Sequence, residues 1–200
     1  MKKIPVTLIY SRICIGIFLC MLSLSHIANY EVYAISFLVI GLLTDIFDGI
    51  IARRLNISSE KLRRLDSIAD QIFWILVAVA TFIECPGFFK NNAVKLIILM
   101  SVEASTYLIS YLKFGKEVAT HAISSKIWTL ILCSTLIQIM ATCNSEALFQ
   151  VCFYVGLITR FEIIAIMLVL KNWTNDVPSI YHAFLLRKGK TIKRHKLFNG

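Results

Sequence analysis

The chain has 200 residues, of which 58% are hydrophobic, and a mean hydropathy of +0.73. A water-soluble fold of this composition would expose too much apolar surface, so it indicates an integral membrane protein with one domain over residues 1–200. The formal net charge is +9, but the basic residues cluster at the ends of apolar runs, where they act as orientation signals and lipid contacts, which argues against nucleic-acid binding.

Six apolar runs are long enough to cross a membrane, which takes about 20 mostly apolar residues per helix. They cover residues 8–27, 33–52, 65–83, 94–112, 127–141 and 148–170, and the fifth is short. The first run follows two lysines as a signal peptide would, but no small-residue cleavage site follows it, so we expect a retained helix. No repeat or linker divides the runs. The sequence therefore predicts an all-α membrane protein with six transmembrane helices.

Six cysteines are scattered along the chain without any C-x-x-C spacing, and most lie inside apolar runs. We expect them to be small residues of membrane helices, with neither a disulfide framework nor a zinc site. They are Cys14, Cys20, Cys85, Cys133, Cys143 and Cys152.

One arginine, Arg12, interrupts the first apolar run. An arginine at this depth has two interpretations. It faces a functional site inside the helix bundle, or its long side chain extends to the lipid headgroups. The sequence leaves both open.

Four aspartates lie where the second apolar run ends and the third begins: Asp45, Asp48, Asp66 and Asp70. The members of each pair are three or four residues apart, so on a helix each pair projects from one face. Two helices joined by the basic turn 53–64 would direct all four carboxylates into one cleft. Carboxylate oxygens suit Mg²⁺ and Mn²⁺, and two such ions can clamp a reacting phosphoryl group. The alternative is that the acids are solvated charges that pair with arginines of the turn.

With Gly49, Ala52 and Arg53, the first two aspartates form the motif D-x-x-D-G-x-x-A-R, and D-x-x-x-D follows in the next helix. This pattern resembles the signature of the CDP-alcohol phosphatidyltransferases, a membrane family that makes phospholipids by displacing CMP from a CDP-linked donor. The segment from Pro5 to Arg12 is similar to the family's opening. One signature position differs, because Leu62 stands where the family has its second glycine.

The resemblance implies a reaction and a set of roles. A hydroxyl group of an acceptor alcohol attacks the phosphorus of a CDP-linked lipid such as CDP-diacylglycerol, and CMP leaves. The four aspartates would hold two Mg²⁺ or Mn²⁺ ions, with Asp45 and Asp66 bridging them, and Asp70 would also be the general base. The residues implied to bind the donor are Thr44, Gly49, Ala52, Arg53 and Leu62. A homodimer is also implied.

Leu62 has three interpretations. Its isobutyl group would crowd the cytidine one turn before Asp66, unless the helix rotates slightly or the donor sits differently. The third interpretation is a catalytically degenerate relative. Retention of every acidic position favours an active enzyme.

The acceptor site is implied by the basic segment between the fourth and fifth runs and by one arginine in the sixth. Its candidates are Lys113, His121, Lys126 and Arg160, which suit the phosphate of an acceptor such as glycerol 3-phosphate. The lysines have an equally good interpretation as orientation signals. Arg160 lies inside an apolar run and therefore points to a partner or a ligand. Glu103, inside the fourth run, either pairs with one of these bases or lines the cleft.

The distribution of lysine and arginine predicts the orientation. With six crossings, the termini, the basic turn and the segment around Lys113 share one side, and the opposite loops hold few basic residues. The positive-inside rule therefore places both termini and the acidic motif in the cytoplasm, in a membrane that we expect to be the bacterial cytoplasmic membrane. We interpret residues 171–200 as a basic tail that lies on anionic lipid.

The size is closest to that of bacterial phosphatidylglycerophosphate synthases, which favours glycerol 3-phosphate as the acceptor. Two other functions are weighed against this one. A membrane prenyltransferase also binds a diphosphate through aspartates and magnesium, but it favours two aspartate-rich motifs far apart in the chain. A transporter or non-enzymatic scaffold would account for charges within the membrane, but not for Gly49, Ala52 and Arg53 beside them.

Overall fold

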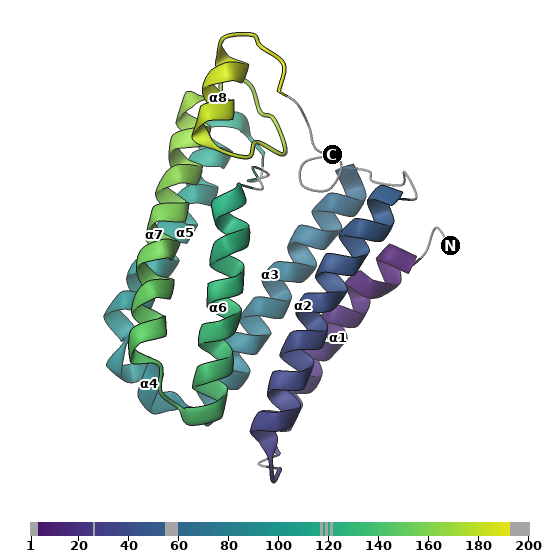
Figure 1. Ribbon diagram of the computed structural model, residues 1–200, viewed down its shortest axis with the longest axis vertical. Helices are drawn as coiled ribbons and strands as arrows, with labels where there is room; N and C mark the ends of the chain where they lie inside the picture. The colour runs from purple at the N-terminus through teal and green to yellow at the C-terminus, as the bar shows by residue number, and fades with distance from the viewer. Residues whose placement is uncertain are drawn as a thin grey trace. The chain divides into compact units, whose positions relative to one another are not determined.

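The computed structural model describes residues 4–25, 27–54, 60–116, 118, 120 and 122–192, and within these ranges it contains helices and no strand (Figure 1). The side chains of residues 52–54, 60, 61 and 63 are not described. The helices are α1 (Ile4–Leu24), α2 (Tyr30–Arg54), α3 (Glu60–Glu84), α4 (Pro86–Asn91), α5 (Ala93–Phe114), α6 (Ile123–Thr142), α7 (Glu146–Val169) and α8 (Ile180–Arg187).

Six of these helices are long and apolar enough to span a membrane: α1, α2, α3, α5, α6 and α7. They coincide with the six apolar runs, and their ends differ by a few residues from the predicted ones. The fifth, predicted to be short, is a helix of 20 residues. Large apolar side chains such as Met21, Ile75 and Leu112 are exposed on the outer faces, as lipid contact requires. The prediction of an all-α membrane protein is confirmed.

The chain forms two compact units. The first contains residues 1–91 and 136–145, and so holds α1 to α4 and the last turns of α6. The second contains residues 92–135 and 146–200, with α5, the rest of α6, α7 and α8.

In the first unit, α1 packs along both α2 and α3 (Figure 1). Phe73 of α3 fills the space where these helices meet and is 1% exposed. Two glycines make room for α3. A Cβ atom at Gly41 of α2 would lie 2.3 Å from Phe73 Cζ, and one at Gly16 of α1 would lie 2.9 Å from Leu76 Cδ1. Small residues that let helices approach closely are typical of membrane helix packing.

In the second unit, α7 packs against α5 and α8. A core of buried side chains joins α7, α8 and the segment between them, and it includes Ile166, Val177 and Ala183. Trp128 of α6 donates a hydrogen bond from Nε1 to the carbonyl oxygen of Cys152 in α7, at 3.0 Å. The helix α5 ends at Gly115, whose left-handed conformation (φ 62°) lets its N–H reach the Tyr111 carbonyl oxygen.

The expectation that no cysteines pair was wrong, because Cys85 and Cys143 form a disulfide in the first unit. Cys85 directly follows α3 and Cys143 directly follows α6, and their Cα atoms are 5.2 Å apart. The chain ends of two helices meet here, so two cysteines 58 residues apart come together without any local spacing pattern. The other four cysteines are free.

The close contact at Gly41 generates a stability prediction. Gly41→Ala should lower the free energy of unfolding by about 1–3 kcal/mol, because the buried Phe73 ring must move to admit the methyl group. Thermal unfolding in detergent measures this change. Gly87→Ala is the matched control, since a Cβ atom at this helical glycine meets nothing within 4 Å. Equal melting temperatures for the two variants would contradict the packing described above.

Candidate metal and phosphoryl-transfer site

Four aspartates from two helices converge on one arginine of a third helix. Arg12 Nη1 lies 3.1 Å from Asp45 Oδ1 and 3.2 Å from Asp66 Oδ1. The same nitrogen also pairs with Asp70, and Nη2 pairs with Asp48. The predicted convergence of the four carboxylates is therefore present, with a guanidinium at its centre.

The helical spacing of the sequence explains this arrangement. The buried face of α1 follows a three- and four-residue repeat through Pro5, Ile9, Arg12, Gly16 and Leu19, so the arginine occupies a position that faces the other two helices. The aspartate pairs of α2 and α3 each lie within one helical turn and point toward that face.

Burial differs among the five charged groups. The side chains of Arg12 and Asp48 are 1% and 3% exposed, whereas those of Asp45, Asp66 and Asp70 are between 30% and 36% exposed. Asp48 and the guanidinium therefore form the interior of the site, and the other three carboxylates form its accessible side. The sequence alone did not distinguish these positions.

Arg12 is the residue that sequence reasoning left undecided. It is fully buried and does not extend to the lipid headgroups. The signal that could have identified it is its place in the repeat of Ile9, Gly16 and Leu19 along α1, which marks the protected face of the helix. A buried arginine requires partners, and the aspartates provide them.

The donor set fits a divalent cation. One oxygen each from Asp45, Asp48 and Asp66 can be chosen such that all three lie within 4.8 Å of one another. Carboxylates gathered this closely repel one another, so the site favours positive charge between them. Oxygen ligands of this kind suit Mg²⁺ and Mn²⁺. Asp70 contacts the same guanidinium but is not a member of this group of three.

The residues expected to bind the donor lie around the end of α2 and the start of α3. Thr44 and Gly49 are half-buried in α2, and the Thr44 hydroxyl donates a hydrogen bond to the Gly41 carbonyl oxygen at 2.6 Å. Leu62 is half-buried in the first turn of α3, one turn before Asp66. The side chains of Ala52 and Arg53 lie outside the described part of the chain.

The residues expected to bind the acceptor belong to the second unit. Lys113 donates hydrogen bonds from Nζ to the carbonyl oxygens of Met167 (3.0 Å) and Leu168 (2.7 Å) near the end of α7, where a helix favours a cation. Lys126 is exposed in the first turn of α6. His121 lies outside the described residues.

Arg160 has protein partners on two sides. Its Nε pairs with the carboxylate of Glu103 in α5, and its guanidinium lies over the ring of Trp128, 4.3 Å from the ring centroid. The sequence left open whether Glu103 pairs with a base or lines a cleft, and the structure shows the pair. This contact satisfies a charge within the membrane.

Two membrane helices bring four carboxylates together around the guanidinium of a third helix. This arrangement defines a class of intramembrane acidic site that is suited to divalent ions. The family model for the CDP-alcohol phosphatidyltransferases matches residues 2–170. The chain belongs to this family, whose members transfer a phosphatidyl group from a CDP-alcohol to an acceptor. No curated protein and no solved structure shows significant similarity to the chain.

The buried arginine generates the second prediction. Arg12→Ala should lower the free energy of unfolding in metal-free buffer by about 3–5 kcal/mol, because it leaves the carboxylates without their central counter-charge. Chemical or thermal unfolding in the presence of a chelator measures the loss. Adding Mg²⁺ should then stabilise this variant more than the parent.

Arg187→Ala is the control for removal of a positive charge. Arg187 is exposed in α8 and makes one long hydrogen bond, to the Val169 carbonyl oxygen at 3.4 Å. Its loss should change the free energy of unfolding by no more than about 0.5 kcal/mol. If Arg12→Ala behaves in the same way, Arg12 does not hold the four aspartates together.

Proposed function

We propose that the chain transfers a phosphatidyl group from CDP-diacylglycerol to the hydroxyl group of a small alcohol and releases CMP, with glycerol 3-phosphate as the first candidate acceptor. The observation that carries the proposal is the set of four carboxylates gathered on Arg12, in a chain that belongs to the CDP-alcohol phosphatidyltransferases. Among the alternative acceptors are inositol phosphate and serine.

In this proposal Asp45, Asp48, Asp66 and Asp70 hold two divalent ions, Mg²⁺ or Mn²⁺. When bound, such ions supply positive charge against the pyrophosphate oxygens, where negative charge builds as the bond to CMP breaks. Arg12 fixes the carboxylates so that their geometry is set before substrate arrives. Preorganised charge of this kind costs no rearrangement during the reaction.

Asp70 is our candidate for the general base. Its side chain is 33% exposed, so an acceptor hydroxyl can reach it, and it stands apart from the group formed by Asp45, Asp48 and Asp66. Arg12 contacts Oδ1 of Asp70, and the proposal assigns the proton to the second oxygen. General bases must lie within hydrogen-bond reach of the proton they accept.

The donor is proposed to lie along the end of α2. Gly49 has no side chain, which allows a phosphate to approach the backbone beside Asp48. Arg53 would donate a forked pair of hydrogen bonds to the pyrophosphate. Thr44, Ala52 and Leu62 are proposed to line the same groove.

For the acceptor phosphate we retain Lys113, His121, Lys126 and Arg160 as candidates. Lys113 and Arg160 already bind protein groups, so they would have to exchange a protein partner for the phosphate or contact it with their remaining N–H groups. Lys126 is exposed at the start of α6, where an anion from solvent can reach it. A homodimer is proposed from the family resemblance.

We further propose that the aspartates face the cytoplasm. The basic turn next to them, residues 53–64, is the kind of segment that stays inside. The Cys85–Cys143 disulfide, at the opposite end of α3 from the aspartates, supports this orientation, because disulfides persist in oxidising compartments outside the cytoplasm.

The main competing function is a degenerate relative that keeps the site but not the chemistry, and Leu62 is the observation that favours it. A prenyltransferase finds less support, since all four aspartates belong to one pair of consecutive helices.

Purified protein supplied with CDP-diacylglycerol, Mg²⁺ or Mn²⁺ and a panel of alcohols should release CMP with at least one acceptor. Metal binding without CMP release from any acceptor would favour the degenerate relative.

Two aspartate variants separate catalysis from metal binding. Asp70→Asn should lower kcat by about 100-fold or more while leaving CDP-lipid binding intact, because it removes the proton acceptor. Asp66→Asn should weaken metal binding as well, measured by the Mg²⁺ concentration that gives half-maximal rate. Glu146→Asn, at an exposed position in the first turn of α7, is the control. Parental activity in both aspartate variants would rule out these roles.

Leu62→Gly tests whether the departure from the family signature limits the donor. If the isobutyl group crowds the cytidine, its removal should lower the KM for CDP-diacylglycerol several-fold, with kcat changed less. Leu65→Gly, in the same helix, controls for the loss of helix propensity, which is about 1 kcal/mol per glycine. An unchanged KM in Leu62→Gly would remove crowding as an explanation.

A further inference from the structure

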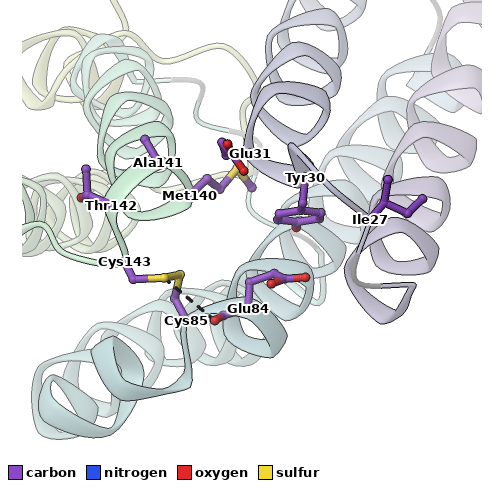
Figure 2. A pocket seen from close by; sticks show the side chains of 9 residues that line it. All are labelled: Ile27, Tyr30, Glu31, Glu84, Cys85, Met140, Ala141, Thr142 and Cys143. Atoms are coloured by element: carbon purple, nitrogen blue, oxygen red, sulfur yellow. Dashed lines mark hydrogen bonds between the residues drawn. A yellow bond between two sulfur atoms is a disulfide. The ribbon is translucent and has the colours of Figure 1, made fainter.

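A polar cavity lies in the first unit, at the other end of α2 and α3 from the aspartates. Its volume is about 430 Å³. The lining residues come from the segment before α2, the first turn of α2, the ends of α3 and α6, and the cysteines that follow these two helices (Figure 2). The polar residues among them include Tyr30, Glu31, Glu84 and Thr142. Tyr30 and Asp45 are fifteen residues apart on one helix, which corresponds to about 22 Å along its axis. The cavity is thus separate from the proposed catalytic site.

Two buried polar atoms in this cavity have no hydrogen-bond partner among the described residues. They are the hydroxyl oxygen of Tyr30 and Oε1 of Glu84. Tyr30 is only 7% exposed, and in Figure 2 its hydroxyl is on the side of the ring toward Glu84. Leaving a buried polar group without a partner is unfavourable. A ligand that bonds to both atoms would recover this cost.

The charged residues of the cavity indicate which net charge such a ligand carries. Glu31 and Glu84 both line it, and the lining residues that the structure describes include no lysine or arginine. The hydroxyl group of Thr142, which also lines the cavity, donates to carbonyl oxygens of its own segment. A cation is therefore the complementary ligand.

The remaining wall favours an organic cation over a metal ion. Ile27, Met140 and Ala141 are apolar and offer contact to carbon atoms, and the aromatic face of Tyr30 attracts ammonium groups. The cavity volume is many times the volume of about 30 Å³ that one water molecule occupies. It is therefore larger than a bare ion needs. An –NH₃⁺ group carries three donors, enough for Glu31, Glu84 and Tyr30.

We infer that this cavity binds a primary ammonium group, supplied by the headgroup of an aminophospholipid or by a free amine. Glu84 Oε1 and a Glu31 carboxylate oxygen accept two of its N–H bonds, and the Tyr30 hydroxyl oxygen accepts the third. The Cys85–Cys143 disulfide joins the ends of α3 and α6 that form two of the walls. The cavity lies at an end of the membrane helices, where lipid headgroups gather.

The experiment uses the delipidated full-length protein and native mass spectrometry with phosphatidylethanolamine, phosphatidylcholine or phosphatidylglycerol. Phosphatidylethanolamine should bind at least about tenfold more tightly than the other two, because trimethylation removes the N–H donors and phosphatidylglycerol has no cation. Propylamine is the free-amine probe. It has no hydroxyl group, so it is no acceptor for the proposed transferase.

Glu84→Gln and Tyr30→Phe should each weaken phosphatidylethanolamine or propylamine binding, by about tenfold for Glu84→Gln. Glu146→Gln is the control for loss of one acid at an exposed position. Asp70→Asn should bind as the parent does, which separates this site from the proposed reaction. Propylamine binding that depends on Glu84, without lipid selectivity, would support the site with a free amine as its source.

Three results would overturn the inference. The first is equal binding of all three lipids together with no binding of propylamine. The second is unchanged binding of both probes in Glu84→Gln and in Tyr30→Phe, each variant having a parental melting temperature. The third is displacement of the amine by micromolar Ca²⁺, which would assign the cavity to a metal ion.

Discussion

The pairing of one buried guanidinium with four carboxylates is the interaction on which the first unit depends. It joins α1, α2 and α3 through charged groups inside an apolar bundle, where such groups are stable only when they are paired. The arrangement ties the geometry of the proposed metal site to the packing of the helices. A displacement of α1 would change both the counter-charge and the positions of the ligands.

The small residues of α1 and α2 contribute to the packing of the same three helices. Gly16 and Gly41 let α3 approach, and Phe73 fills the space that they leave. Asp45 lies one turn beyond Gly41 and Asp70 one turn before Phe73, so the apolar contact and the charged cluster are adjacent layers of one bundle. Packing and site geometry are therefore set by neighbouring residues on the same helix faces.

Much of this could be predicted from sequence, because the relevant signals are local. Length and hydropathy of the apolar runs predicted the six membrane helices, and spacings of three and four residues predicted that each aspartate pair shares a face. The position of Arg12 remained open, since its two orientations differ only in which face of α1 meets protein. Which face of α1 is buried depends on the helices that pack against it, although the repeat through Ile9 and Gly16 carried part of that information.

The contacts that sequence could not predict join residues far apart in the chain. Cys85 and Cys143 have no spacing pattern in common, and they meet because α3 and α6 end at the same place. Arg160 and Glu103 were each expected to have a partner or a ligand, but their pairing depends on how α5 packs against α7. Side-chain chemistry showed that partners were needed, and tertiary packing decided which.

The Cys85–Cys143 bond also closes a covalent ring in the polypeptide. The ring contains α4, α5 and α6. A protease that cuts any one loop inside it leaves both fragments attached through sulfur, so the cleaved protein would migrate as one species until a thiol is added. The same cut in the loop between α6 and α7, beyond Cys143, would release a separate fragment at once.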